Sequence, residues 1–354
     1  MKRVLGVSLL AGMMVVGGMV LAGPASAATI DVHPGESIQA AINHASPGDV
    51  IVVHPGVYHE SVVVNKDHLT LRGAGAGANG TVIEPPESSN RCLHGAAGFC
   101  VFGKKTESGF HRRTGVTVEG FEFKGFPAFG LVGFGVKDLL VQRNFGVDNG
   151  EYGLTCFNCA GISFLYNKAT GAGESGFYVG DSREADALLV GNLAFGNGTT
   201  GFLFRDANVG RAKGNKAYGN CSGMQLVNTG APNNVHGWVV NDNDVYHNDA
   251  ACKGEEEGPP PFSGLGIGLF GGKNNRILHN TVWANRPTGP SAASGGIAVA
   301  SSKSFGGANA SDNEIRSNVL YRNKPVDILW DGTGVGNEFT KNKCKLSNPD
   351  GLCN

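Results

Sequence analysis

The chain has 354 residues, with 29 basic and 30 acidic side chains and a formal net charge of −1. A chain so close to neutral lacks the general positive charge that draws proteins to nucleic acid or to anionic membranes. We therefore expect no nucleic-acid partner, and any attraction for an acidic ligand has to be local.

Residues 1–27 have the features of a secretory signal peptide. Two basic residues follow the first Met, an apolar run extends from Val4 to Leu21, and a small-residue cleavage site ends at Ala27. A membrane anchor is the alternative, but glycines interrupt the run, and no second apolar stretch is long enough to span a bilayer. We expect a secreted protein without a membrane partner, beginning near Ala28.

Residues 29–53 predict a strand, a helix beginning near Glu36 or Ser37, and a second strand. Ile38, Ala41 and Ile42 have the spacing of one helix face. Further along, residues 84–112 lack a regular pattern and predict an irregular surface excursion. Regular alternation of apolar residues resumes in the stretch that begins at residue 115.

From Gly130 to Asn342 the sequence repeats with a period in the low twenties. Each unit has a Gly, a short strand with alternating apolar residues, and two asparagines five positions apart. The closing pairs are Asn144/Asn149, Asn192/Asn197, Asn215/Asn220, Asn243/Asn248, Asn280/Asn285, Asn318/Asn323 and Asn337/Asn342, and one unit has Asn167 followed by Ala172.

Such a repeat suits three short strands joined by tight turns, which is one coil of a parallel β-helix. Coils of this kind stack at about 4.8 Å, so like residues lie over like residues. Asparagines stacked in a turn can hydrogen-bond from coil to coil through their side-chain amides. The asparagines are therefore interpreted as structural, and the chain as an all-β solenoid.

The repeat is similar to that of right-handed parallel β-helix proteins of the pectin-lyase-like superfamily, of the secreted bacterial type. The resemblance implies a right-handed coil and an N-terminal helical cap, which a solenoid needs to cover its open first edge. We expect a signal peptide over 1–27 and a single domain over 28–354, with a cap over 29–53, regular coils over 115–342 and a tail over 343–354. We expect a monomer.

Eight cysteines in a secreted chain predict four disulfides. Local pairing is favoured, and cross-pairing is the alternative. Cys221 and Cys252 each follow a closing asparagine at the same corner of neighbouring coils. The predicted pairs are Cys92–Cys100, Cys156–Cys159, Cys221–Cys252 and Cys344–Cys353.

Two insertions interrupt the regular coils at one corner. Seventeen residues separate Asn248 from Gly266, and ten separate Asn285 from Gly296. The two insertions belong to adjacent coils, so they are expected to stack as a pair of loops. Long loops on one side of a solenoid usually border its binding surface.

The candidate site lies where the strands of two neighbouring coils end. Asp181 and Asp206 occupy equivalent positions there, roughly 5 Å apart, and one pKa of such a pair is expected to rise. The catalytic candidates are Asp181, Asp206, Arg205, Arg183 and Lys213, and the substrate-binding candidates are Tyr178, Gln225, Asn228 and Arg211. Arg211 and Lys213 are placed farther along the same turn, and Tyr178 and Gln225 on the outward face of the strands.

This combination has two chemical interpretations. In a lyase or epimerase, a cation neutralises a uronate carboxylate and a base removes the C5 proton, and a calcium ion bridging Asp181 and Asp206 could take the place of the cation. In a hydrolase, two carboxylates act together. The structural alternative is an ion-pair ladder on a solvated surface. A metal requirement is left open.

We expect a protein that binds acidic polysaccharide, and an activity that cleaves or modifies it, as a lyase, hydrolase or epimerase, is left open. The alternative is a non-catalytic extracellular structural or adhesion module. That alternative is supported by the absence of a Gly-His-Gly motif, which polygalacturonases carry, and of the Asp-Pro-His-Asp motif of alginate epimerases.

The signal-peptide interpretation predicts export with removal of the leader. N-terminal sequencing of protein recovered from the culture medium should start close to Ala28, because the small-residue site ends at Ala27. A membrane-bound product that keeps Met1 would contradict the cleavage.

Overall fold

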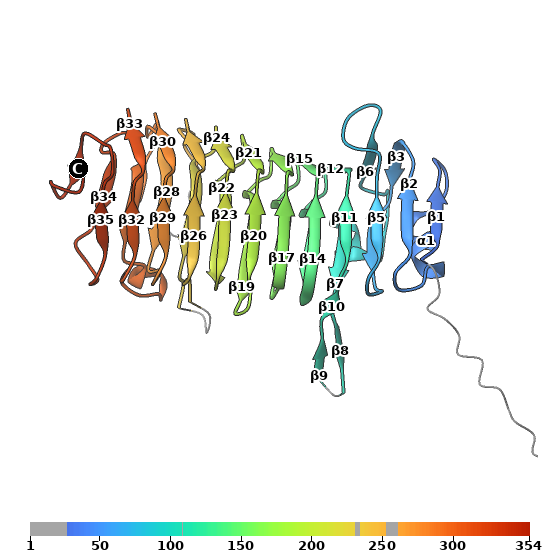
Figure 1. Ribbon diagram of the computed structural model, residues 1–354. Coiled ribbons are helices and arrows are strands. Elements are labelled where there is room, and N and C mark those ends of the chain that lie inside the picture. Colours follow the sequence, from blue (N-terminus) through green and yellow to red (C-terminus); the bar gives the residue numbers. More distant parts are fainter. Residues whose placement is uncertain (1–26, 108, 231–233, 253–260) are drawn as a thin grey trace, which may run out of the picture.

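The protein is an elongated stack of coils, and each coil passes in turn through three parallel β-sheets (Figure 1). This arrangement comes from a computed structural model, which describes residues 27–107, 109–230, 234–252 and 261–354. The signal peptide predicted over 1–27 lies, apart from Ala27, outside the described residues. Each of the three sheets, here called A, B and C, runs along the length of the stack.

The strands that the structure describes are as follows. Sheet A has 13 strands: β1 (Thr29–Val32), β2 (Val50–Val53), β5 (Thr70–Arg72), β11 (Thr117–Glu119), β14 (Val136–Gln142), β17 (Ala160–Leu165), β20 (Ala187–Val190), β23 (Gly210–Lys213), β26 (Trp238–Asn241), β29 (Arg276–Leu278), β32 (Glu314–Arg316) and β35 (Glu338–Thr340), with β10 (Arg113–Thr114) beside β14. Sheet B has 10 strands: β3 (Gly56–His59), β6 (Thr81–Glu84), β12 (Phe121–Lys124), β15 (Phe145–Val147), β18 (Lys168–Thr170), β21 (Leu193–Phe195), β24 (Lys216–Tyr218), β27 (Asp244–Tyr246), β30 (Thr281–Trp283) and β33 (Val319–Tyr321). Sheet C has 11 strands: β4 (Val62–Val64), β7 (Ala97–Phe102), β13 (Phe129–Phe134), β16 (Tyr152–Phe157), β19 (Ser175–Ser182), β22 (Thr200–Ala207), β25 (Ser222–Val227), β28 (Leu265–Phe270), β31 (Gly295–Ala300), β34 (Ile328–Trp330) and β36 (Ser347–Asn348).

The predicted helix is present as α1 (Ile38–His44), at the N-terminal end of the stack (Figure 1). Ser37 is its N-cap, and the Ser37 hydroxyl accepts a hydrogen bond from the Ala40 N–H at 3.2 Å. Ile38 and Ile42 are buried in the core, as their spacing predicted. The capping role of this helix stays a prediction. The two other helical segments in the described chain are short, η1 (Cys92–Gly95) and η2 (Lys303–Phe305).

The prediction of an irregular excursion over residues 84–112 is only partly correct. Ala97–Phe102 forms β7, an ordinary strand of sheet C, with Phe99 and Val101 in the core. The alternation escaped notice because this strand is apolar on both faces, and periodicity does not identify such runs as strands. The rest contains an antiparallel hairpin, β8 (Lys104–Thr106) with β9 (Gly109–His111), which projects from the stack (Figure 1).

The asparagine ladders predicted from the repeat are confirmed. Asn215 is fully buried at the turn between sheets A and B. Its side-chain amide donates to Asn243 at 3.0 Å and to the Leu189 carbonyl at 2.9 Å. Its side-chain oxygen accepts the backbone N–H and the amide of Asn192, both at 2.9 Å. Each asparagine therefore satisfies polar groups of two neighbouring coils.

A second ladder runs through the turn between sheets B and C, and it has a gap at Ala172. A third ladder, at the turn between sheets C and A, consists of Asn275, Asn313 and Asn337. The sequence prediction missed this third ladder, although Asn275 and Asn313 each precede a predicted pair by five residues. The predicted pair Asn337/Asn342 is wrong in its placement, because Asn337 belongs to the third ladder and Asn342 follows Asn318 in the first.

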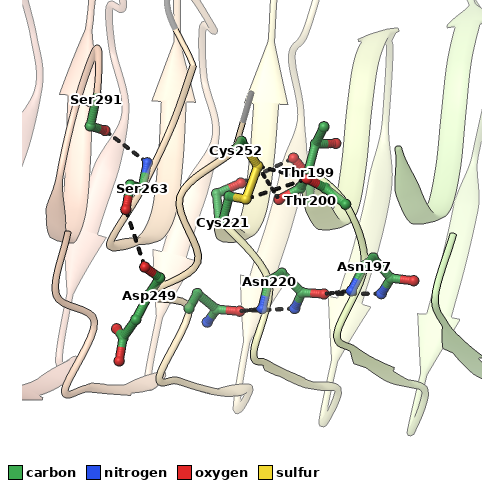
Figure 2. The surroundings of a disulfide bond; sticks show 12 residues. Asn197, Thr199, Thr200, Asn220, Cys221, Asp249, Cys252, Ser263 and Ser291 are labelled. Atoms are coloured by element: carbon green, nitrogen blue, oxygen red, sulfur yellow. Dashed lines mark hydrogen bonds between the residues drawn. A yellow bond between two sulfur atoms is a disulfide. The ribbon is translucent and has the colours of Figure 1, made fainter. Parts of the chain in front are cut away.

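All four predicted disulfides are present: Cys92–Cys100, Cys156–Cys159, Cys221–Cys252 and Cys344–Cys353. Figure 2 shows Cys221–Cys252 joining two neighbouring coils beside the second asparagine ladder. The Cys221 sulfur lies 3.3 Å from the Gly198 carbonyl oxygen of the preceding coil. Among the described helices, none has the length and apolarity needed to cross a bilayer.

The ladders predict opposite effects for two substitutions, one in the first ladder and one in the second. Asn215→Ala should lower the free energy of unfolding by about 3 kcal/mol, because it leaves buried polar groups of two coils without partners. Ala172→Asn should raise it by about 1 kcal/mol, because it closes the gap between Asn149 and Asn197. Denaturant unfolding measures both changes, and destabilisation by Ala172→Asn would contradict the role given to the ladder.

Candidate functional site

The candidate site lies on the outer face of sheet C. Phe177 and Val179 point into the core, as the alternation predicted, and Tyr178 lies on the outer face between them. The outer face is apolar on both sides of the central strands β19 and β22. One apolar cluster includes Val132, Phe102 and Phe157, and the other includes Leu265, Phe270 and Phe262. Charged and polar side chains occupy the sheet between these two clusters.

Tyr178 forms the floor of the polar region. Its ring stacks on Tyr152 with centroids 4.7 Å apart and contacts Phe157 at 4.8 Å. Gly180 makes room for the ring, since a Cβ atom there would lie 2.0 Å from the Tyr178 hydroxyl oxygen. The side chain is fully buried, and its hydroxyl has no hydrogen-bond partner among the described residues. Burial raises the Tyr178 pKa, and the positive charge of Arg205 offsets only part of that effect.

Arg205 lies above this floor on the neighbouring strand β22. It pairs in register with Gly180, and its guanidinium carbon lies 5.4 Å from the centre of the Tyr178 ring. One guanidinium nitrogen is 4.0 Å from the Asp181 carboxylate. The Arg205 side chain is 39% exposed, so the ring below holds the cation in place while one side of it remains open to a ligand.

The two carboxylates of the predicted pair have different environments. Asp206 is 1% exposed, and it accepts hydrogen bonds from the backbone N–H and the hydroxyl of Thr229. The Asp181 side chain is 46% exposed. Burial raises the pKa of Asp181, with a further contribution from Asp206, and Arg205 opposes the rise. Of the two predicted carboxyl groups, Asp181 is therefore the one with a raised pKa. The Asp206 carboxylate has a structural role, because it holds Thr229.

The corner geometry also explains why these positions are aspartates. Asp181 has φ 51° and Asp206 has φ 50°, and Asn158 and Gly271 at equivalent corners also have positive φ. Asp, Asn and Gly are the residues that adopt this left-handed backbone most readily. The residue type at this corner is thus accounted for by backbone geometry, and only the environment of Asp181 indicates a further role.

The remaining predicted residues are dispersed. Arg183 is exposed in the turn after β19. Arg211 and Lys213 do not lie in that turn but in strand β23 of sheet A, and the Lys213 ammonium group is 3.9 Å from Asp242.

Two predicted binding residues are buried and donate hydrogen bonds to other groups of the protein. The Gln225 amide donates to Ser222 at 2.6 Å, and the Asn228 amide donates to the Gly271 carbonyl at 3.1 Å. Gln225 still faces the outer side of sheet C, next to a hollow described below, whereas Asn228 supports a turn.

A hollow of about 210 Å³ opens beside Arg205 on the same face. Its walls come from strands β22, β25 and β28 and from loops that precede or follow strands of sheet C. The lining residues are Leu203, Arg205, Gln225, Val227, Thr229, Phe262, Phe270 and Phe305. Sequence reasoning missed the three phenylalanines, although it placed the loop that carries Phe262 at the border of the binding surface.

The two insertions stack as a pair, as predicted. The Ser263 N–H donates to the Ser291 hydroxyl at 2.9 Å, and the Arg286 N–H donates to the Asp249 carboxylate at 2.6 Å. Figure 2 shows Asp249, Ser263 and Ser291 beside the Cys221–Cys252 disulfide. These contacts fix the described part of the first loop, and they place Phe262 against Phe270 with ring centroids 5.3 Å apart.

The described residues contain no group of three or more His, Cys, Asp or Glu side chains arranged to hold a metal ion. Calcium takes six to eight oxygen ligands. Since Thr229 already occupies the Asp206 carboxylate, the pair of aspartates alone does not provide such a set.

Comparisons with known proteins agree with this architecture. A family described as "Right handed beta helix region" matches residues 87–240. The fold is a right-handed parallel β-helix. The resemblance seen in the repeat is thereby confirmed for the fold. A comparison with curated proteins gives no match.

Solved structures with this fold span most of the chain. The A-module of the mannuronan C-5 epimerase AlgE4 from Azotobacter vinelandii has a TM-score of 0.61 and 18% identity, covering 87% of this chain and 92% of that one. A variant of the periplasmic alginate epimerase AlgG has a TM-score of 0.55 and 14% identity, covering 84% and 71%. The DFA-IIIase from Arthrobacter chlorophenolicus A6, without its lid, has a TM-score of 0.54 and 14% identity, covering 83% and 84%.

The burial of Tyr178 predicts that its phenol stays neutral at pH values where exposed tyrosines ionise. An ordinary tyrosine has a pKa of about 10, and the Tyr178 pKa lies above that. The ultraviolet absorbance titrations of the wild-type protein and of Tyr178→Phe should therefore coincide up to about pH 10. A difference in the tyrosinate signal below that pH would show that the site is more open than described.

Proposed function

We propose that the protein binds an acidic polysaccharide along the outer face of sheet C and modifies it by removing a proton from a uronate residue. The observation that carries the proposal is the half-exposed Arg205 guanidinium above the Tyr178 ring, 4.0 Å from the Asp181 carboxylate. A polymer of uronic acid carries one carboxylate per sugar, and an arginine binds a carboxylate with two parallel hydrogen bonds.

The two charged groups suit different steps of one reaction. Arg205 would neutralise the uronate carboxylate, which makes the neighbouring C5 proton more acidic. Asp181 would accept that proton, and its raised pKa brings it closer to the value that favours a base at neutral pH. Return of a proton from water to C5 on the opposite face gives an epimer. Breakage of the C4–O bond, with a proton from water taken up by the leaving sugar oxygen, gives an unsaturated product instead.

Tyr178 has a positioning role in this proposal. Its ring supports the guanidinium of Arg205, and its buried hydroxyl does not reach the ligand surface. Tyr152 and Phe157 hold the ring from the side of β16. Removal of the ring should therefore loosen Arg205 without removing a reacting group.

Hydrolysis is less well supported than proton removal. A hydrolase needs two carboxyl groups that act together on the bond, and Asp206 is buried and hydrogen-bonded to Thr229. The similarity in fold to a mannuronan C-5 epimerase and an alginate epimerase supports a uronan as the substrate class. We also propose that the protein acts outside the cytoplasm, which the four disulfides support.

A binding module without catalysis is the second candidate. It is favoured by the small number of groups that combine charge with exposure at the site, since Arg205 and Asp181 stand over an otherwise aromatic and apolar floor. Such a surface binds a charged polymer without needing a reacting residue. The two candidates share the binding face and differ in the effect of Asp181.

The experiment is a screen against alginate, pectate and glycosaminoglycans, with and without calcium. Ultraviolet absorbance detects the unsaturated product of elimination, NMR detects epimerised sugars, and reducing-end release detects hydrolysis. If the proposal is correct, Arg205→Ala and Asp181→Asn each lower kcat/KM for a uronan at least about a hundredfold. Arg276→Ala is the matched control, because Arg276 is a half-exposed, ion-paired arginine on sheet A.

The outcomes separate the candidates. Binding that Arg205→Ala weakens, without turnover of any polymer, supports the binding module. Equal activity of the wild type, Arg205→Ala and Asp181→Asn would place the site elsewhere and refute the proposal.

A further inference from the structure

The hollow beside Arg205 has a chemical character that the proton-removing groups do not explain. Its walls are Leu203, Val227, Phe262, Phe270 and Phe305, and none of these side chains donates or accepts a hydrogen bond. The polar lining groups are Arg205, Gln225 and Thr229. The occupant must therefore combine an apolar part with a polar or anionic part.

The size of the hollow limits the occupant further. Its volume is about 210 Å³, below the roughly 300–1,000 Å³ of pockets for drug-sized ligands. It can take a substituent or one sugar ring. A polymer segment or a lipid chain would extend beyond it.

An unmodified sugar fits these walls poorly. Its hydroxyl groups would lose their contacts with water and would face side chains that offer no partner, which is unfavourable for buried polar groups. An acetyl ester has a methyl group for the apolar walls and one carbonyl oxygen that needs a single donor. Gln225 can provide that donor, since the described contacts use only one of its two amide N–H groups, in the bond to Ser222.

The charge of Arg205 selects between the two common esters of uronic acids. A methyl ester on the carboxyl group removes the negative charge that Arg205 would bind. An O-acetyl group leaves the carboxylate intact. The apolar walls and the Arg205 cation both find a partner only if the acyl group is attached to a hydroxyl oxygen of the sugar.

We propose that the hollow bounded by Phe262, Phe270 and Phe305 binds the O-acetyl group of an acetylated uronan whose carboxylate is held by Arg205. This inference rests on the proposed function, and it adds the substituent that the polymer carries. Two segments next to strands of sheet C would then determine specificity. The loop before β28 contributes Phe262 to the walls, and η2 contributes Phe305.

The test compares the same polymer with and without its acetyl groups. Isothermal titration calorimetry should show that O-acetylated mannuronan fragments bind the wild-type protein roughly three- to tenfold more tightly than the same fragments after alkaline deacetylation, because one methyl group leaves water. Methyl-esterified fragments should bind more weakly than both.

Two variants examine the hollow without touching Arg205. Val227→Phe should fill it, and Phe305→Ala should remove one wall. Both should lose the preference for the acetylated polymer and keep the affinity of the wild type for the deacetylated one. Tyr321→Ala, an exposed aromatic residue on sheet B, is the matched control and should keep the preference. Thermal unfolding confirms that each variant is folded.

The results distinguish this inference from the proposed function. Equal affinity for the two forms of the polymer, with weakening by Arg205→Ala, would refute the acetyl site and leave the proposed function standing. Tighter binding of the methyl ester would refute the assignment of the substituent. If the wild-type protein binds no uronan in any form, both proposals fail.

Discussion

The hydrogen bond from one asparagine side chain to the next is the interaction on which the rest of the structure depends. A right-handed parallel β-helix must turn sharply between its sheets, and each turn leaves backbone N–H and carbonyl groups in a buried place. The side chains of Asn192, Asn215 and Asn243 satisfy these groups in successive coils. Because the bonds run along the stack, they also hold the coils in register, and register determines which side chains lie together on each outer face.

The candidate site follows from that register. Gly180 pairs with Arg205, and Tyr178 pairs with Leu203. A shift by one residue would turn Tyr178 into the core and Phe177 to the outside. The empty side of Gly180 lets the Tyr178 ring lie flat along its own strand, under the guanidinium of the next. Hydrogen bonds buried in the turns thus help to position a cation on the outer face of sheet C.

The sequence predicted the coils well because individual residues at fixed positions of the repeat mark the strands and the turns. Alternating Phe177 and Tyr178 identify a strand, and asparagines five positions apart identify the two turns. The same reasoning failed where the chain departs from the repeat. Arg211 and Lys213 were assigned to a turn because the link between β22 and β23 is very short. Phe262 lies in the first insertion and Phe305 in η2, between β31 and β32, and no periodicity indicates which way a side chain points in such irregular segments.

The disulfide between Cys221 and Cys252 closes one complete turn of the solenoid into a covalent ring. Each coil otherwise contacts mainly its neighbours, so a pulling force on the C-terminus would detach coils one after another, as a thread unwinds from a spool. At Cys252 the load would pass through the disulfide to Cys221, so the coil between the two cysteines could only detach as one unit. The coils that carry Tyr178 and Arg205 precede Cys221, so a force on the C-terminus would reach them only after that unit had detached.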